Sequence, residues 1–105
     1  MAKIEKGWEY IGRCGVDSGQ LLITDPCYLS DWVDNESDSK IGKSSMSYAG
    51  ACNATLSKER GGQLHNKLGI DLAVAFSSGY GDGVYPVYAR KNEDGRIVEV
   101  KIIME

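Results

Sequence analysis

The chain has 105 residues, of which 42% are hydrophobic and 26% charged, a composition typical of a globular protein and unlike that of a disordered chain. Lys and Arg number 12 against 15 Asp and Glu, so the formal net charge of −3 provides no basic field that would attract duplex nucleic acid. No apolar run approaches the roughly 18 residues that span a bilayer, and residues 1–6 lack the apolar core of a signal peptide. We therefore expect one cytoplasmic domain over residues 1–105 that binds neither membranes nor duplex nucleic acid.

The first third of the chain reads as two strands followed by a short helical segment. Bulky and small side chains alternate over Trp8–Val16, and Gln20–Thr24 is a short apolar run. Asp and Gly between them favour a tight turn at residues 16–19. Residues 27–33 have apolar side chains near helical spacing, which predicts one or two helical turns that seat Trp32 on the core. No other helix is expected.

The middle third carries weaker signals. Residues 34–45 are rich in Asp, Ser, Asn and Lys, the composition of a solvated loop. Small and β-branched residues predict a strand over residues 47–56, and Gln63–Leu68 is predicted as a further strand. Between them, residues 58–62 have the composition of a hairpin turn.

The last third has the clearest strand pattern. Leu72, Val74 and Phe76 alternate with smaller residues, which predicts a strand with its bulky apolar face against a core. A glycine-rich loop then leads into a strand over residues 84–90, where Pro86 predicts an edge position or a bulge. Asn92-Glu93-Asp94-Gly95 is a strong hairpin turn.

The final strand, after residue 96, should have one solvent-exposed face. Glu99 and Lys101 lie on the face opposite the apolar series Val98, Val100, Ile102 and Met104. Ile97 and Ile103 break this alternation, and we expect them to bury on a partner, so a homo-oligomer is predicted. With 13 glycines and two prolines, the whole pattern predicts a mostly β fold, either a small antiparallel sandwich or a partly open barrel with one short helical segment.

The cysteine and histidine residues do not form a metal-binding pattern. Cys14, Cys27 and Cys52 are odd in number and have no Cys-x-x-Cys spacing, and the single histidine is His65. A structural zinc site needs about four ligands, usually in close pairs. We therefore predict buried free thiols, a surface or strand-end position for His65, and no metal or other cofactor.

Two segments resemble a known family. The early run with Val16-Asp17-Ser18-Gly19 and Asp25-Pro26-Cys27-Tyr28, and the later run Gly79-Tyr80-Gly81-Asp82-Gly83-Val84-Tyr85-Pro86-Val87-Tyr88, are similar to a family of small proteins from bacteria and their phages that is known only as a domain of unknown function. The resemblance covers roughly the first and last thirds of the chain. It implies a compact β fold, a phage or prophage context and, for a phage protein, the host cytoplasm. It implies no established activity.

The glycine-rich run suggests a ligand site. Three glycines within Gly79–Gly83 let backbone amides turn toward one point, where they can hold an anion such as a phosphate. Neighbouring tyrosines could stack on a base, and an arginine could add charge. The candidate ligand-binding residues are Tyr80, Gly81, Asp82, Gly83, Tyr85, Tyr88, Asp17, Ser18 and Arg90. The alternative is an ordinary glycine-rich turn in which Asp82 bonds the local backbone.

The leading hypothesis is a small non-catalytic binding protein that works as an oligomer. Its ligand would be a small anion such as a cyclic nucleotide, and the phage-like resemblance suggests a sponge that sequesters a host signalling nucleotide as an anti-defence measure. One alternative is a metal-dependent hydrolase that uses Asp17, Asp25 and Asp82, since hard cations collect several carboxylates. No catalytic residue is assigned, because a single histidine far from any nucleophile motif does not indicate a catalytic site. A third reading is a structural module that pairs a strand edge with another protein.

Overall fold

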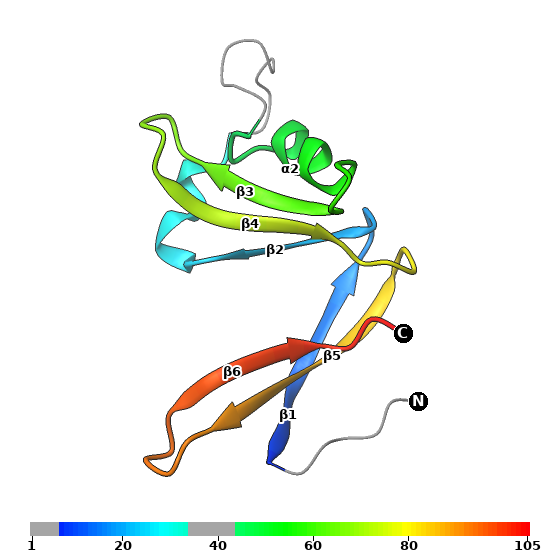
Figure 1. Cartoon of the computed structure of the whole chain (residues 1–105), viewed down its shortest axis with the longest axis vertical. Helices are drawn as coiled ribbons and strands as arrows, with labels where there is room; N and C mark the ends of the chain where they lie inside the picture. Colours follow the sequence, from blue (N-terminus) through cyan, green and yellow to red (C-terminus); the bar gives the residue numbers. More distant parts are fainter. Residues whose placement is uncertain (1–6, 34–43) are drawn as a thin grey trace. The chain divides into compact units, whose positions relative to one another are not determined.

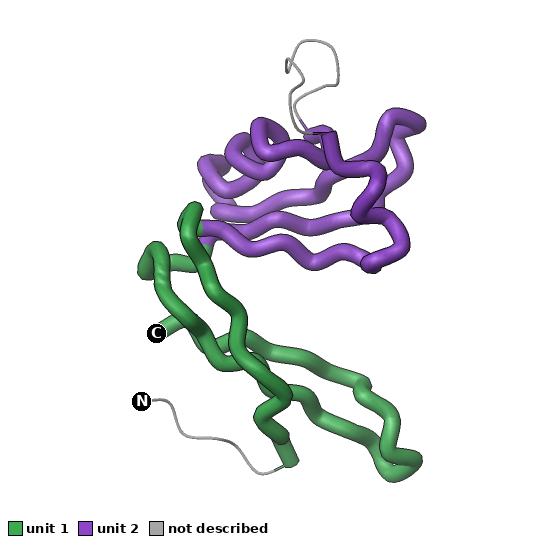
Figure 2. Tube along the Cα trace, turned by 180° about the vertical axis from the view of Figure 1, so that it is seen from behind, with its two compact units in different colours: residues 1–19, 78–105 green, residues 20–77 purple. Residues whose placement is uncertain are grey.

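The computed structural model describes residues 7–33 and 44–105 and is mostly β, as the sequence predicts (Figure 1). It contains two antiparallel three-stranded sheets, neither of them closed into a barrel, and a short α-helix. The chain divides into two compact units (Figure 2). Unit 1 runs to Gly19 and resumes at Ser78, and unit 2 is the intervening segment Gln20–Ser77.

Unit 1 is a sheet with strand order β1-β5-β6. Its strands are β1 (Trp8–Val16), β5 (Gly83–Lys91) and β6 (Ile97–Ile102), and all three predicted strands are confirmed. A turn at residues 92–96 joins β5 to β6, with the Asn92 amide donating to the Arg96 carbonyl at 2.9 Å. The β1–β5 pairing runs from Trp8 opposite Arg90 to Val16 opposite Gly83, so it joins segments from the two ends of the chain.

Pro86 lies in the central strand, which corrects the prediction of an edge position or a bulge. The Ile103 amide donates to the Pro86 carbonyl at 3.2 Å, so the Pro86 backbone is directed toward β6 and not toward β1. The β5–β6 ladder stops beside it, at Val87 opposite Ile102. The missing N–H of Pro86 therefore falls where a ladder bond is no longer required.

The apolar face of β6 is also not placed as expected. Val98 and Val100 are exposed, whereas Lys101 on the opposite face is half-buried. The Lys101 ammonium lies 4.2 Å from the centroid of the Trp8 ring, so its face of the sheet is covered by aromatic side chains. Tyr88 is buried on the same face, with the Tyr10 ring edge-on at 5.9 Å. One face of this sheet thus carries aromatic side chains, and Val98 and Val100 on the other face are exposed.

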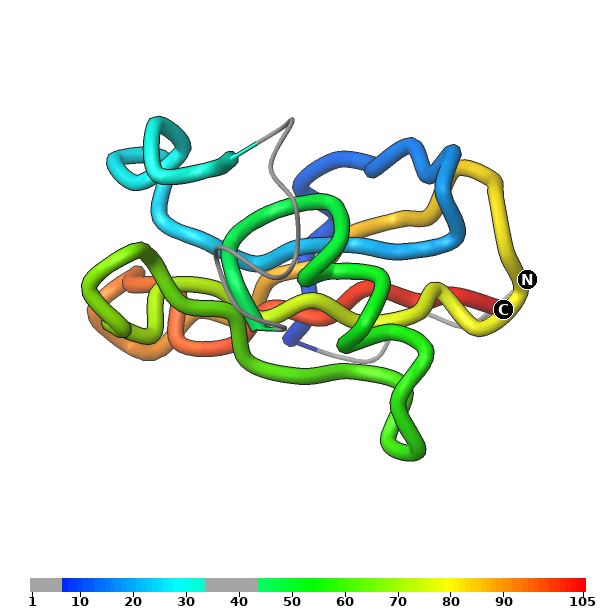
Figure 3. Tube along the Cα trace, turned by 90° about the horizontal axis from the view of Figure 1, so that it is seen from above, coloured from blue at the N-terminus to red at the C-terminus, as the bar shows by residue number. Residues whose placement is uncertain are grey.

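Unit 2 is a sheet with strand order β2-β4-β3, covered on one face by a helix. Its strands are β2 (Gln20–Thr24), β4 (Asp71–Ser77) and β3 (Gly61–His65), and its helical segments are the 3-10 helix η1 (Pro26–Asp31) and the α-helix α2 (Tyr48–Thr55). Figure 3 looks down on α2 lying over the three strands. The predicted helical turns after Pro26 are confirmed as η1, and Trp32 packs against the core.

α2 replaces the strand predicted over residues 47–56. Ser47 caps the helix, its Oγ accepting the Gly50 amide hydrogen at 2.9 Å, and the following residues are mostly small. Gly50 and Ala51 are buried, and Ala54 lies so close to β3 that a Cβ added at Gly62 would come within 3.3 Å of the Ala54 Cβ. The helix therefore packs by close approach of small residues, and this leaves no bulky apolar stripe in the sequence to reveal it.

The same helix explains why β4 buries the opposite face from the one predicted. Ala73 and Ala75 are buried under α2, while Val74 is exposed and Phe76 only half-buried. Small side chains are required under a helix that approaches so closely. The core of unit 2 is made of buried residues Met46, Ala51, Leu64, Ala73 and Ala75, with Leu22, Trp32, Ala54 and Leu72 packed against them.

The remaining connections in unit 2 differ from prediction in detail. Residues 58–60 link α2 to β3 and do not form a hairpin turn, since Gly61 and Gly62 already belong to β3. β3 ends at His65, which confirms the strand-end position predicted for the histidine. Of the predicted loop over residues 34–45, residues 34–43 lie outside the described residues.

Candidate functional site

The loop before β5 is held by buried hydroxyl groups. Gly79 and Gly81 have φ angles of +82° and +88°, which glycine adopts readily. The Gly81 carbonyl turns inward and accepts hydrogen bonds from Ser78 Oγ at 2.6 Å and from Tyr85 Oη at 2.7 Å. Ser78 is only 1% exposed, and its amide donates to the Gly19 carbonyl at 2.9 Å. The loop is therefore fixed in one conformation and tied to the connection that follows β1.

The outer side of this loop is open. The Tyr80 side chain is 79% exposed, and Asp82 and Gly83 are exposed as well. The amides of Gly81 and Asp82 donate no hydrogen bond to any described residue. The loop thus has two consecutive amide donors without a described partner, next to an exposed aromatic ring and an exposed aspartate.

Part of the predicted ligand site comes together here. The pairing of Val16 with Gly83 and the bond between Ser78 and Gly19 bracket Asp17 and Ser18, so these two exposed residues lie beside the loop. Tyr85 also belongs to this end of the sheet. It is buried, and its hydroxyl braces the Gly81 carbonyl, so it supports the loop and presents no open ring face.

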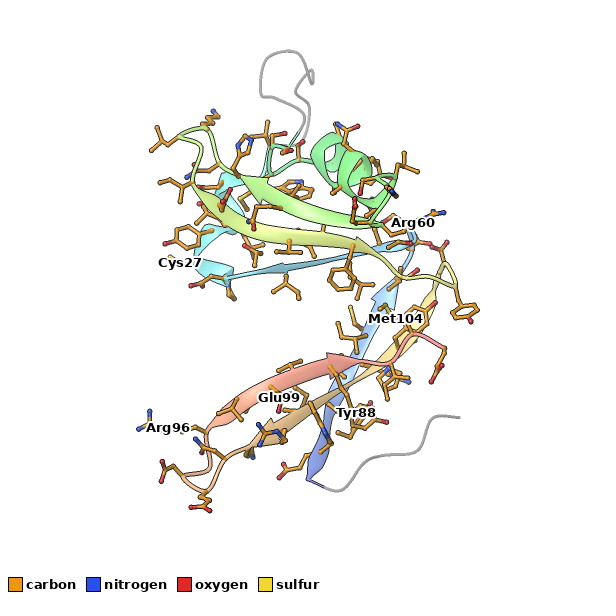
Figure 4. The ribbon with its side chains drawn as sticks, in the orientation of Figure 1. Cys27, Arg60, Tyr88, Arg96, Glu99 and Met104 are labelled. Carbon is orange, nitrogen blue, oxygen red and sulfur yellow. The ribbon has the colours of Figure 1, made fainter. Side chains whose placement is uncertain are left out.

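Tyr88 and Arg90 lie elsewhere. They follow Gly83 by five and seven residues along an extended strand, which places them roughly 17 and 23 Å from it. Tyr88 is buried against Tyr10, and Arg90 forms an ion pair with Glu99 on β6. Figure 4 labels Tyr88 and Glu99 on their strands. The structure therefore gathers Asp17, Ser18 and residues 80–83 at one end of β5 and leaves the other two residues apart.

The three aspartates of the hydrolase alternative belong to two different units. The Asp25 carboxylate belongs to unit 2, where its Oδ1 accepts the Cys27 amide hydrogen at 2.9 Å and caps η1. Asp17 and Asp82 belong to unit 1. Within residues 7–33 and 44–105, no three His, Cys, Asp or Glu side chains are grouped as a metal site requires.

All three cysteines are free thiols, but none is buried, which corrects the prediction of buried thiols. Cys27 is exposed, and Cys14 and Cys52 are half-buried. Cys52 lies one helical turn after Tyr48 on α2. The negative charge of its thiolate, with a hydrogen bond between the two side chains and slight desolvation, raises the pKa of the Tyr48 phenol. This pair was missed because residues four apart become neighbours only if the segment is helical.

Ser78 is the site residue that sequence reasoning missed. Its hydroxyl and amide fix both the glycine-rich loop and the residue-19 connection, yet serine next to glycine is common in any turn. Only its burial reveals the bracing role.

Comparison with known protein families identifies the family of this chain. The sequence profile of a family described as "Protein of unknown function (DUF4241)" matches residues 2–102. The chain belongs to the DUF4241 family. Neither a curated protein nor a solved structure matches it significantly. No helix in the described part of this DUF4241 member is long and apolar enough to cross a membrane.

Proposed function

We propose that this DUF4241 protein is a non-catalytic binding protein for a small anionic ligand of the nucleotide class. The observation that carries the proposal is the pair of unpaired Gly81 and Asp82 amides on a loop fixed from within by Ser78 and Tyr85. Consecutive backbone amides provide positive potential for an oxyanion without a cationic side chain. A loop that is already fixed loses little conformational freedom when a ligand binds.

The other exposed groups suit the rest of a nucleotide. The open ring of Tyr80 can stack on a base, a contact that contributes about 1 to 3 kcal/mol per base. Asp17 and Asp82 carry negative charge and repel a phosphate placed against them, so their role is to accept hydrogen bonds from base amino groups or ribose hydroxyls. The loop supports one arrangement of a nucleotide. In it the phosphate binds the two amides, the base stacks on Tyr80, and the sugar faces the carboxylates.

Sequestration is favoured over catalysis by the side chains at this end of the sheet. Residues 17–19 and 78–83 contain no His, Cys or Lys, and their carboxylates are not part of any group of three metal-ligating side chains among the described residues. Together with the bacterial and phage resemblance of the two loop segments, this supports a protein that binds a host signalling nucleotide and removes it from circulation.

The test is incubation with a panel of linear and cyclic nucleotides, followed by calorimetry and by mass spectrometry of the ligand released on denaturation. We expect one class to bind and to be recovered intact. Recovery of altered ligand would instead indicate catalysis, and no uptake by the parent protein would overturn the proposal.

Two matched variants localise the binding. Tyr80→Ala should weaken binding by about 5- to 150-fold, the equivalent of one lost stacking contact. Tyr28→Ala removes another exposed tyrosine, on η1 in unit 2, and should bind like the parent. Equal binding by both variants would show that the loop is not the site.

A further inference from the structure

β6 leaves one edge of the unit 1 sheet open. In the strand order β1-β5-β6, no described strand pairs with its outer side (Figure 1). Open edges are templates for pairing with another chain, and proteins usually interrupt them. The β1 edge is interrupted by a register shift between Tyr10 and Gly12, and β6 has a shift at Val98, so the regular part of the β6 edge runs from Glu99 to Ile102.

The direction of the β6 backbone groups follows from one hydrogen bond. The Ile103 amide donates to Pro86 on β5. In an antiparallel ladder, alternate residues direct both backbone groups toward the same neighbour. Counting back along the strand, Lys101 and Glu99 face β5, and the N–H and C=O groups of Val100 and Ile102 face the open edge.

We propose that β6 binds β6 of a second copy of this chain, antiparallel and centred on Val100. In this register Val100 lies opposite its own counterpart and Glu99 lies opposite Lys101 of the second copy, with the bulged Val98 near Ile102 of that copy. The strand is thus self-complementary, with two opposite-charge pairs on one face and only aliphatic pairs on the other. Each such cross-strand pair is favourable. The unit 1 sheets of the two copies then form one six-stranded sheet.

Other registers are disfavoured by the same charges. A twofold axis between two residues would place apolar side chains opposite charged ones and mismatch the faces of the sheet. A twofold axis at Lys101 places the two Lys101 side chains opposite each other. A twofold axis at Glu99 places the two Glu99 side chains opposite each other. Like charges directly opposite each other destabilise strand pairing, so Val100 is the centre that the sequence selects.

The exposed aliphatic side chains of β6 supply the apolar part of the interface. Val100 is 55% exposed, Ile97 54% and Val98 46%. Pairing at Val100 brings the two Val100 side chains side by side, which removes apolar surface from water. This inference goes beyond the proposed ligand binding and does not depend on it.

Charge variants test the interface by sedimentation or light scattering over a range of concentrations. The parent should reach the mass of two chains, and E99K or K101E alone should be monomeric, because each places like charges opposite each other. The double variant E99K/K101E restores opposite charges and should dimerise again. Because the double variant also loses the contacts of Glu99 with Arg90 and of Lys101 with Trp8, its recovery cannot come from within one chain. Circular dichroism checks that each variant is folded.

Cross-linking tests the register. Hydrogen-bonded antiparallel partners have Cα atoms about 5.5 Å apart, within the range that a disulfide bridges, so V100C should link two copies under mild oxidation. I97C is the matched control, since Ile97 is equally exposed but lies roughly 20 Å from its counterpart across the axis. A monomeric parent at all concentrations, single charge variants that still dimerise, or equal cross-linking of V100C and I97C would each overturn the proposal.

Discussion

Gly50→Ala is the substitution with the most decisive expected effect on stability. Within a helix this change normally stabilises by about 1 kcal/mol, because alanine has the higher helix propensity. At Gly50, however, an added Cβ would lie 1.9 Å from the Ser45 carbonyl oxygen, and Cβ contacts below 3.0 Å are essentially never seen. The helix and the Ser45 backbone must therefore separate by about 1 Å.

The structure around Ser45 cannot easily accommodate that movement. Ser45, Met46 and Ser47 are buried, and the Met46 amide donates to the His65 carbonyl at 2.9 Å. Moving α2 outward stretches the Ser47 cap on Gly50 and opens space beside Ala51 in the core. Overpacking typically costs about 1 to 3 kcal/mol and a lost cap about 1 kcal/mol, so a net loss of about 1 to 3 kcal/mol remains after the propensity gain of about 1 kcal/mol.

Thermal unfolding followed by circular dichroism measures the effect. A loss of about 1 to 3 kcal/mol should lower the melting temperature by about 4 to 24 °C in a domain of this size. Gly15→Ala in β1 is the control, because its added Cβ meets nothing within 4 Å and its φ is not positive, so its melting temperature should change little. If Gly50→Ala melts at or above the parent temperature, the close approach of α2 to Ser45 is wrong.

Three further expectations can be checked with single variants. Ser47→Ala removes the α2 cap and the 2.7 Å contact with the Ser45 hydroxyl, and should lower the free energy of unfolding by about 1 to 2 kcal/mol in urea titrations; no change would mean that the cap is not formed. The pKa of Tyr48 is raised in the folded state, so above about pH 10 the folded protein retains a proton that the unfolded chain loses. The free energy of unfolding should therefore fall as the pH rises above about 10, and it should fall less in Cys52→Ala. Gly81→Ala places a side chain at φ +88° and should destabilise by about 1 to 2 kcal/mol although its Cβ meets open space; unchanged stability would refute the left-handed conformation.

The strands were predictable because their signals are local. Alternation over Trp8–Val16 and the apolar runs at Gln20–Thr24 and Asp71–Ser77 require no knowledge of partners, and all three strands form where predicted. α2 was not predictable in this way, since its contact with the sheet is made by Gly50, Ala51 and Ala54. A segment of small residues has no strong period in hydrophobicity, and only the Ser47 cap marks its start.

The differences from prediction at Pro86 and Tyr88 have one origin. β1 pairs with β5, although all of unit 2 lies between these two strands in the sequence. Local pattern placed Pro86 at an edge and treated Tyr88 as an available stacking ring, but a strand between two others buries side chains that an edge strand would expose. The glycine-rich loop itself was predictable, because the tolerance of glycine for positive φ is a local property. Long-range pairing then decides which neighbours the loop receives: Val16 opposite Gly83 brings Asp17 and Ser18 to it, and the length of β5 carries Arg90 away. Of the predicted site residues, those that lie close together are therefore the ones in the loop itself or joined to it by the β1–β5 ladder.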